Sequence, residues 1–450
     1  TYFHIRGTDH TRINMTLNDV PLNDSESQTV FWVNMTDMAS SMSSLNVQRG
    51  VGTSTNGSAS FGASINMQTG NQCWESGVED KSRHELSFYG CTYNTSREMV
   101  NAHIVLPNQW RANARFSKVN SDGFLYRTAS DLYSYYGDLG WYGIKTKVIA
   151  RFFGGSEKTG MGWDGVDYNT AYGIDGADRR YNPAGEYTTT ATDGSDSTAY
   201  YPNQTDNYVQ QHAQLTLIHR LSTRWNLSAT AHYTHGAGYY EQYKRKKLSY
   251  WGLLGNGQLA IGNGLLAIGE DRKAYGMYRK HLDNHFFGGV VAAKYISEPV
   301  DVQLGGAANY YIGDHFGTLN YLEDSLILPI NYEYYRNDAK KTDANIYAKA
   351  NWRIINRAQE QLSLYADLQY RYVRYERNGM NDEDMTDLPL KVDFHFFNPK
   401  AGLTYQNRGH LLSASFAIAN REPSRKSYKE NVVYDAATGE YTGLPHAERL

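Results

Sequence analysis

Long hydrophobic runs are missing from this chain of 450 residues. No stretch of about 18 apolar residues occurs, and the mean hydropathy is −0.62, which together exclude a protein that crosses a membrane with helices. A membrane barrel stays open as an interpretation, because its strands alternate lipid-facing and lumen-facing residues and therefore have the mean hydropathy of a soluble protein.

Cysteine and proline are scarce, and neither sign of charge is in large excess. The two cysteines, Cys73 and Cys91, cannot cross-link a chain of this length, and both a disulfide pair and two unrelated thiols fit the sequence. Only 10 prolines are present, and the net charge is −3. This charge gives neither a basic field nor an acidic tail, so we expect no nucleic-acid partner.

Catalytic and metal-binding motifs are missing as well. The sequence contains no His-Glu-x-x-His, no paired-cysteine motif and no Gly-x-Ser-x-Gly elbow. Its 14 histidines show no metal-ligand spacing: His232 and His235 are three residues apart, which places them on opposite faces of a strand. We therefore expect a protein that is not an enzyme and that has no bound metal or cofactor.

Tyrosine and glycine, in contrast, are abundant, with 38 and 41 residues. From about Gln109 onward, apolar and polar residues alternate over nine or more positions, as at 225–234, 345–354 and 362–372. This alternation indicates strands, and strands of about 9–11 residues are those that cross a membrane at a tilt. Tyrosines cluster at their ends, as at 332–335. Such clusters are typical of the aromatic girdles of a membrane barrel, although cross-strand packing in a soluble β-protein also produces them.

Two kinds of connection alternate along this region. The short turns lie at 106–109, 142–143, 222–224, 297–299, 356–358 and 406–409. The long polar stretches lie at 156–211, 236–276 and 313–343. Compact soluble domains rarely carry several such loops, whereas outer-membrane barrels have short turns on one rim and long loops on the other. The turns predict about 13 strands. The predicted fold is an all-β transmembrane barrel, built as an antiparallel meander.

Residues 1–70 have a different pattern. In order along the chain they contain an Ile5-Arg6-Gly7 strand, a turn with the sequence NDVPLND at 18–24, a glycine-rich loop with VQRGVGTSTNG at 47–57, and a strand with FGASINMQT at 61–69. This set of motifs closely resembles the plug domain of TonB-dependent outer-membrane transporters. Downstream segments at 232–243, 283–288 and 419–423 look like barrel segments of the same family.

The resemblance implies a mixed α+β plug domain inside the lumen of a barrel of about 22 strands. We expect residues 1–75 to form the C-terminal part of the plug, and residues 76–450 to form the first ~13 strands of the barrel. The rest of the plug and of the barrel would then lie outside this sequence, which we interpret as a fragment.

The resemblance also implies a latch between plug and barrel. Arg6 and Arg49 each precede a glycine in a plug motif, and in the family such arginines pair with barrel glutamates; Glu422 and Glu448 are the candidate partners. An ion pair in a partly desolvated lumen is strong when it is hydrogen-bonded, yet it is costly to form, which suits a latch that breaks under force. The alternative is that both arginines lie in ordinary surface turns.

Candidate ligand-binding residues come from the plug loops and from the longest predicted outer loop. The plug candidates are Asp9, His10, Arg12, Glu26, Gln28, Phe31 and Trp32, and the loop candidates are Trp163, Tyr168, Arg179 and Arg180. Aromatic and arginine side chains are common binding anchors, and arginine recognises carboxylates through two hydrogen bonds. Alternatively, the polar plug residues only solvate a loop, and Phe31 and Trp32 fill the plug core.

The function that the resemblance implies is TonB-dependent active import across the bacterial outer membrane. A ferric siderophore is the first candidate ligand; cobalamin, haem and an oligosaccharide are the alternatives. Energy would come from a TonB-type energy-transducing protein, since the outer membrane has no ATP. An alternative from another class is a receptor or scaffold subunit of a larger outer-membrane complex, with a surface lipoprotein as partner. A passive porin or a barrel enzyme fits the plug motifs poorly.

Overall fold

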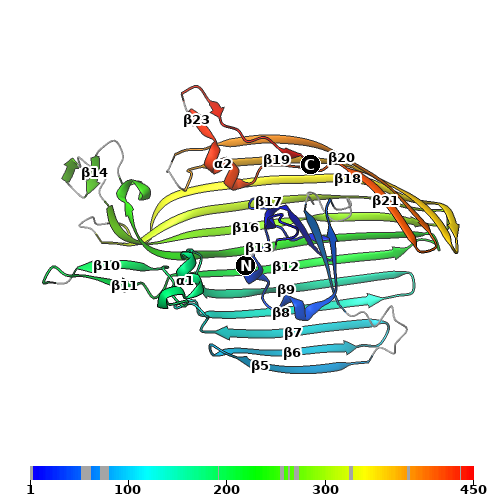
Figure 1. Cartoon of the computed structure of the whole chain (residues 1–450), viewed down its shortest axis with the longest axis horizontal. Helices are drawn as coiled ribbons and strands as arrows, with labels where there is room; N and C mark the ends of the chain where they lie inside the picture. The colour runs from blue at the N-terminus through cyan, green and yellow to red at the C-terminus, as the bar shows by residue number, and fades with distance from the viewer. Residues whose placement is uncertain are drawn as a thin grey trace.

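One large sheet dominates the computed structural model, which describes residues 4–51, 62–70, 81–190, 192–253, 258–261, 264–267, 273–323, 328–382, 386–435 and 437–449 (Figure 1). We call this sheet of 13 strands the wall sheet. Its strand order, β21-β20-β19-β18-β17-β16-β13-β12-β9-β8-β7-β6-β5, follows the chain, and every neighbouring pair is antiparallel. The predicted antiparallel meander is confirmed, as an open sheet.

The wall strands have the following bounds: β5 (Arg83–Cys91), β6 (Thr95–Val105), β7 (Trp110–Ser121), β8 (Ser130–Tyr142), β9 (Thr146–Gly160), β12 (Thr205–Arg220), β13 (Trp225–Lys247), β16 (Lys273–Ile296), β17 (Val300–Leu322), β18 (Tyr332–Arg357), β19 (Glu360–Gly379), β20 (Leu390–Asn407) and β21 (His410–Ala417). The connections contain α1 (Tyr168–Tyr172), η6 (Ile174–Gly176), β10 (Glu186–Thr190), β11 (Asp196–Tyr200), η7 (Leu248–Trp251), β14 (Gln258–Ile261) and β15 (Gly264–Ala267). After β21 follow β22 (Asn420–Arg421), α2 (Arg425–Asn431), β23 (Val433–Asp435), β24 (Glu440–Thr442) and β25 (Glu448–Arg449).

The short and long connections lie on opposite rims of the wall sheet. In an antiparallel meander, successive connections alternate between the two ends of the strands. All six predicted short turns join strands at the rim on the right of Figure 1, and the β10–β11 hairpin projects at the other rim. This is the arrangement that the turns predicted.

The strands are much longer than the 9–11 residues predicted. β13, β16, β17 and β18 have 23, 24, 23 and 26 residues, so most of the predicted loops at 236–276 and 313–343 are strand. At about 3.3 Å per residue, a strand of this length extends roughly 80 Å. Beyond the apolar band the outer face no longer meets lipid, so the apolar–polar alternation disappears while the backbone ladder continues. The sequence pattern therefore marks only the middle of each strand.

The outer face of the wall sheet carries an apolar band between two rows of aromatic residues. At the short-turn end, Trp110 is paired with Trp141, and the rings of Trp225 and Tyr295 are 5.2 Å apart. Further along the same strands, Tyr233 is paired with Phe287, and both are exposed. Along β13 about eight residues, or ~26 Å of strand, separate the two rows. At the ~40° tilt of barrel strands this corresponds to a height of roughly 20 Å, close to the ~25 Å apolar band of an outer-membrane barrel.

The tyrosines at 332–335 do not belong to either row. Tyr334 and Tyr335 are buried with Trp251 and Tyr278 in an apolar cluster at the long-loop end, which we call the outer cluster. Their interpretation as girdle residues is therefore wrong. The cause is again the length of the strands, which carries β18 far beyond the outer aromatic row.

The N-terminal residues form a small mixed sheet of their own, which we call the N-terminal sheet. Its order is β2-β1-β4-β3, with bounds β1 (Ile13–Leu17), β2 (Val20–Pro21), β3 (Met42–Arg49) and β4 (Ala63–Thr69), and β1 is parallel to β4. Asn18 and Asp19 join β1 to β2 with φ of 55° and 67°, as a type I′ hairpin turn requires. In the part of this segment that the structure describes, the helical elements are three 3-10 turns: η1 (His10–Arg12), η2 (Trp32–Met35) and η3 (Met38–Ser41).

The predicted strand at Ile5-Arg6-Gly7 is wrong. Ile5 and Thr8 form an isolated bridge, and Arg6 and Gly7 turn between them with φ of 52° and 76°. Two further predictions lie outside the described residues: the glycine-rich loop from residue 52 onward, and the pairing of Cys73. Cys91 ends β5 and is exposed and free.

The N-terminal sheet packs against the inner face of the wall sheet. The buried side chains of Ile13, Met15 and Met67 form one apolar core with Tyr136 of β8 and Phe153 of β9. In Figure 1 the small sheet crosses the middle of the wall strands. Among the helices that the structure describes, none combines the length and the apolar character needed to span a membrane.

Candidate functional site

Polar side chains of the wall sheet surround a turn that follows β2. Asp24 shapes this turn, because its Oδ1 accepts hydrogen bonds from the backbone nitrogens of Glu26 (3.1 Å) and Ser27 (2.7 Å). The turn thereby presents Glu26 and Gln28 to β17, β19 and the segment after β22. We call residues 24–28 the contact turn.

Glu26 of the contact turn is almost completely buried. Its carboxylate accepts hydrogen bonds from Tyr311 Oη (3.0 Å) and His315 Nε2 (2.7 Å) of β17, and from Tyr375 Oη (2.6 Å) of β19. Arg425 of α2 lies 3.8 Å away. One carboxylate of the N-terminal segment is therefore held by two strands of the wall sheet and by α2.

These partners keep Glu26 ionised despite its burial. Burial raises the pKa of the Glu26 carboxyl, but His315, Arg425 and the Tyr375 hydroxyl outweigh this effect, and the pKa lies well below its usual range. A buried charge of this kind is stable only while its partners stay in place. The contact therefore depends on the N-terminal segment remaining docked.

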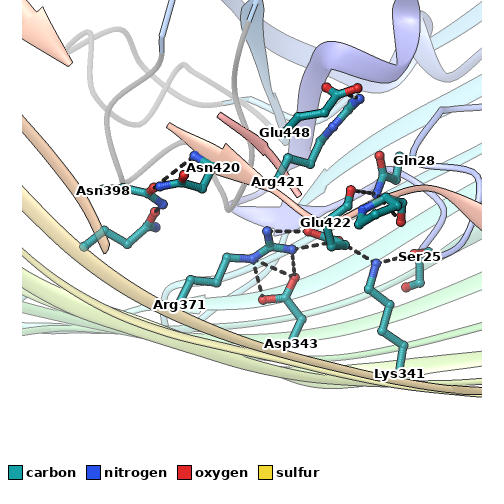
Figure 2. Close-up of polar contacts among 12 residues, drawn as sticks. Ser25, Gln28, Lys341, Asp343, Arg371, Asn398, Asn420, Arg421, Glu422 and Glu448 are labelled. Carbon is teal, nitrogen blue, oxygen red and sulfur yellow. Dashed lines mark hydrogen bonds and ion pairs between the residues drawn. The ribbon is translucent and has the colours of Figure 1, made fainter. Parts of the chain in front are cut away.

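A second group of charges lies beside the contact turn, around Glu422 (Figure 2). Glu422 pairs with Lys341 Nζ at 2.7 Å and with Arg371 Nη1 at 2.7 Å, and Arg371 also pairs with Asp343 at 2.6 Å. Two cations and two carboxylates thus balance in a buried site. Lys341 Nζ also donates to the Ser25 carbonyl at 2.5 Å, which links this group to the contact turn. We call Lys341, Asp343, Arg371 and Glu422 the Glu422 cluster.

The backbone after β22 completes this contact. Gln28 Nε2 donates to the Glu422 carbonyl oxygen at 3.0 Å, and the Arg425 backbone nitrogen donates to the Glu26 carbonyl oxygen at 2.9 Å. Every bond between the contact turn and the wall is polar. Such bonds exchange readily for bonds to water, unlike apolar packing.

A third contact joins the 3-10 turn η1 to β22 and β25. Arg12 pairs with Glu448 at 3.1 Å, Arg421 pairs with the same carboxylate at 2.9 Å, and Arg421 Nη1 donates to the Thr11 carbonyl oxygen at 2.5 Å. The Arg12–Glu448 pair is half exposed, with 43% and 41% of the side chains accessible. Water screens this pair more than those of the Glu422 cluster.

A fourth contact lies at the opposite flank of the N-terminal sheet. Asp37 precedes η3 and pairs with Arg97 of β6 and Arg115 of β7, both at 3.1 Å. Burial raises the pKa of Asp37, but the hydrogen bond from Ser40 and the two arginines outweigh this effect and lower the pKa. The Glu26 and Asp37 contacts thus lie at opposite flanks of the N-terminal segment, on either side of its apolar packing against β8 and β9.

A small polar cavity lies between the contact turn and the wall. Its volume is about 60 Å³, and its lining includes Asn14, Asn23, Phe286, Asn309 and Arg421. This volume is enough for a few water molecules. It is too small to hold a metal chelate.

The structure places the predicted latch residues differently from the expectation. Among the residues that the structure describes, neither Arg6 nor Arg49 lies within ion-pair distance of a carboxylate. Glu422 and Glu448 both contact the N-terminal segment, but through Gln28 and Arg12 instead. The expected pairing of Arg6 and Arg49 with these glutamates is therefore not the one found. Arg6 and Arg49 do not pair with these glutamates because Arg6 lies in an exposed turn and Arg49 lies at an exposed strand end.

The predicted ligand-binding residues of the N-terminal segment have mainly structural contacts. Glu26, Gln28 and Arg12 bind the wall, as described above. Asp9 Oδ1 accepts from the Thr11 nitrogen at 2.8 Å and so caps η1, next to the half-buried His10. Trp32 packs against the apolar core, whereas Phe31 is 42% exposed.

The predicted residues of the outer loop lie in the connection between β9 and β12. Trp163 and Tyr168 are more than half exposed, and Arg179 is exposed. Arg180 stacks over the rings of Tyr126 (4.6 Å) and Tyr93 (5.4 Å), which come from two other connections of the long-loop rim. The loop therefore presents aromatic and cationic groups at the surface of this rim.

Several residues of the contact were absent from the predicted site. They are Tyr311, His315, Lys341, Asp343, Arg371, Tyr375 and Arg425. The alternation of the wall strands could have identified one of these residues, because Arg371 is one of the polar residues that alternate with apolar residues along β19. A charged residue on the inward face of a barrel strand needs a partner, and the N-terminal segment supplies several.

Comparisons with known proteins agree with this architecture. The family model described as "TonB dependent receptor-like, beta-barrel" matches residues 151–443. No curated protein matches the chain in sequence. Among solved structures, the copper transporter OprC superposes with a TM-score of 0.66 at 11% identity, over 95% of this chain and 60% of that one.

Two further solved structures have the same fold. The ferripyoverdine receptor of the outer membrane of Pseudomonas aeruginosa gives a TM-score of 0.61 at 14% identity, over 100% of this chain and 54% of that one. The unliganded ferric citrate transporter FecA gives 0.62 at 12% identity, over 93% and 56%. At such identities the likeness concerns the fold alone, and this chain spans between 54% and 60% of the three structures.

The family match covers well over half of the chain, and it falls on the strands that carry the apolar band and the two aromatic rows. Proteins of this family lie in the outer membrane of Gram-negative bacteria, and they are not enzymes. The chain belongs to the TonB-dependent receptor-like β-barrel family of outer-membrane proteins.

Proposed function

We propose that the protein imports a scarce, large solute across the bacterial outer membrane, with residues 1–75 as part of a plug that closes the lumen. The observation that carries this proposal is the chemistry of the contact turn. Its buried bonds to the wall are all polar, so water replaces them when the N-terminal sheet moves.

Energy for this movement comes from outside the protein. The outer membrane has no ATP, and we propose a TonB-type energy-transducing protein of the inner membrane as the partner. Buried ion pairs suit such a step, because they hold the closed state firmly but lose their partner abruptly once they separate. A pull on the N-terminal sheet would break the Glu26 contacts and open the small cavity beside them.

We propose a ferric siderophore as the solute. Arg180 between two tyrosine rings, beside exposed aromatic residues, fits an anionic chelate with an aromatic or otherwise flat surface. The solved structures with the same fold include a ferripyoverdine receptor and a ferric citrate transporter, which supports a metal chelate as the ligand class. Cobalamin, haem and an oligosaccharide are the alternative ligands.

Growth under iron limitation tests the proposal. Cells with the intact protein should grow on a ferric siderophore as the sole iron source, whereas cells without it, or without the TonB-type partner, should not. Arg180→Ala should weaken uptake, because the stacked guanidinium is lost, while Lys426→Ala on the exposed face of α2 serves as the matched control. If growth depends on the protein with cobalamin but with none of a panel of ferric chelates, cobalamin replaces the ferric siderophore as the proposed ligand. Uptake in cells that lack the TonB-type partner would overturn the proposed mechanism.

A further inference from the structure

Two histidines and an aspartate meet on neighbouring wall strands, far from the contact turn. His235 of β13 is paired with His285 of β16, and Asp283 lies two residues from His285 on the same face. His235 Nε2 is 3.0 Å from Asp283 Oδ1, and His285 Nε2 is 3.7 Å from the same oxygen. We call these three residues the outer-face triad.

The outer-face triad points away from the lumen. His232 and Gln214 are paired across β13 and β12, and Gln214 donates to the Leu17 carbonyl of the N-terminal sheet, so this face of the wall points inward. His235 has the opposite parity to His232, and it shares its face with the exposed Tyr233. The triad therefore faces outward, where the protein meets lipid and water.

The position along the strand places the triad at the level of the lipid headgroups. Tyr233 and Phe287 belong to the aromatic row at the long-loop end of the apolar band. His235 and His285 follow at the next outward position, about 7 Å further along the strands. Asp283 lies one outward position beyond, and the side chains of His235, His285 and Asp283 are 34%, 41% and 49% accessible.

The donor set fits a transition metal ion. The ligand atoms of the three residues lie within 4.8 Å of one another, and this is the one such group among the residues that the structure describes. Two imidazole nitrogens and a carboxylate oxygen are typical ligands of Zn²⁺, whereas Mg²⁺ and Ca²⁺ prefer oxygen ligands. Ligand atoms on one tetrahedral zinc lie about 3.4 Å apart, so small side-chain rotations complete the geometry.

A further contact orients one of the histidines. Tyr233 Oη lies 2.7 Å from His285 Nδ1, so the hydroxyl binds the nitrogen that does not face Asp283. A hydrogen bond to the second ring nitrogen is what fixes the orientation of metal-binding histidines elsewhere. The rings of His235 and His285 also stack, with centroids 4.7 Å apart. Both arrangements direct the free imidazole nitrogens toward the same carboxylate.

We propose that His235, Asp283 and His285 bind one Zn²⁺-like transition metal ion on the outer wall of the barrel, with water or a lipid headgroup oxygen as the fourth ligand. The ion joins β13 to β16 where these strands leave the apolar band and continue as an extended hairpin. This site does not rest on the transport proposal. The sequence alone did not reveal it, because its ligands lie 48 residues apart and meet only through the strand register.

Zinc binding by the intact protein, purified in detergent without a histidine tag, tests the proposal. Isothermal titration with Zn²⁺ should find one ion per chain. His235→Ala and His285→Ala should each raise the dissociation constant roughly 100-fold or more, and Tyr233→Phe should raise it roughly tenfold, as loss of an orienting contact does. Co²⁺ in place of Zn²⁺ should give a visible absorption band in the wild type that both histidine variants lack.

His395→Ala is the matched control. His395 lies on the same outer face and also has a tyrosine partner, since Tyr370 Oη is 2.6 Å from its Nδ1, but it is not part of the triad. This variant should bind Zn²⁺ as the wild type does. Heat-modifiable migration in gel electrophoresis confirms that each variant forms a folded barrel. Wild-type protein without a bound ion, or folded His235→Ala and His285→Ala variants with wild-type affinity, would overturn the proposal.

Discussion

At the scale of single residues, burial decides how much each ion pair beside the N-terminal segment contributes to stability. The side chains of Lys341 and Glu422 are 8% and 4% exposed, whereas those of Arg12 and Glu448 are about 40% exposed. Loss of one partner from a buried pair costs about 3–5 kcal/mol, because the other charge stays unpaired away from water. An exposed pair contributes about 1 kcal/mol or less.

We therefore expect Lys341→Met to loosen the N-terminal sheet far more than Arg12→Ala. Lys341→Met removes the ion pair to Glu422 and the bond to the Ser25 carbonyl, and it leaves the Glu422 cluster with an excess negative charge. Hydrogen exchange of peptides that contain β1 and β4 measures the free energy of opening in each variant. Equal exchange in the two variants would show that burial does not determine the strength of the contact.

The sequence predicted one side of these contacts but not the pairs. Arg371 was not among the predicted residues, although the alternation along β19 is local information that would have placed it on the inward face. The partner of each inward residue depends on how the N-terminal sheet lies across the wall. Gln28 and Glu422 are 394 residues apart, and no periodic pattern links such positions. The family resemblance named Glu422 and Glu448 as contact residues, but it gave the wrong arginines.

At the scale of elements, the strands owe their length to packing outside the bilayer. η7 folds back onto β16, β17 and β18, and Trp251 is fully buried among Tyr278, Leu319 and Tyr334. Gly276 makes room for it, because a Cβ there would lie 2.6 Å from the Trp251 ring. The outer cluster thus covers one face of these strands at a level beyond the apolar band. The sequence pattern hid this because tyrosine, the main residue of the cluster, also marks membrane girdles.

We expect Trp251→Ala to destabilise the outer ends of these strands without unfolding the barrel. Loss of a buried tryptophan costs about 3–5 kcal/mol through the cavity that it leaves. Limited proteolysis of the intact protein should then cut between residues 245 and 275 many times faster than in the wild type, while the heat-modifiable gel shift persists. Trp163→Ala, at an exposed position, should leave the cleavage rate unchanged. Equal rates in all three proteins would mean that the outer cluster does not support the strands.

At the scale of the whole molecule, the two rims of the wall sheet have different environments. The rim with short turns carries Trp110, Trp141 and Trp225 close to the turns, so it leaves little chain outside the bilayer. The other rim carries the extended strands, the β10–β11 hairpin and the outer cluster. In an outer-membrane barrel the short-turn rim faces the periplasm and the long-loop rim faces the cell exterior.

We expect an epitope tag after Gly194, at the tip of the β10–β11 hairpin, to bind antibody on intact cells. A tag after Ala358, in the short turn between β18 and β19, should bind antibody only after the outer membrane is permeabilised. Both positions lie in exposed turns, so the insertions should leave the fold intact. Antibody binding to the Ala358 tag on intact cells would show that the barrel has the opposite orientation.

The polar contacts described for the N-terminal segment lie at its two flanks, with Asp37 on β6 and β7, and the contact turn on β17 and β19, on either side of the apolar core that it shares with β8 and β9. A rigid body that is fastened at two points responds to a pull according to where the pull enters it. A pull midway between the fastenings loads both together, so they must fail at the same moment. A pull near one of them tilts the body like a lever, and the two fail in turn at a lower peak force. The point at which force reaches the sheet then determines which flank opens first, and so on which side a path through the lumen begins.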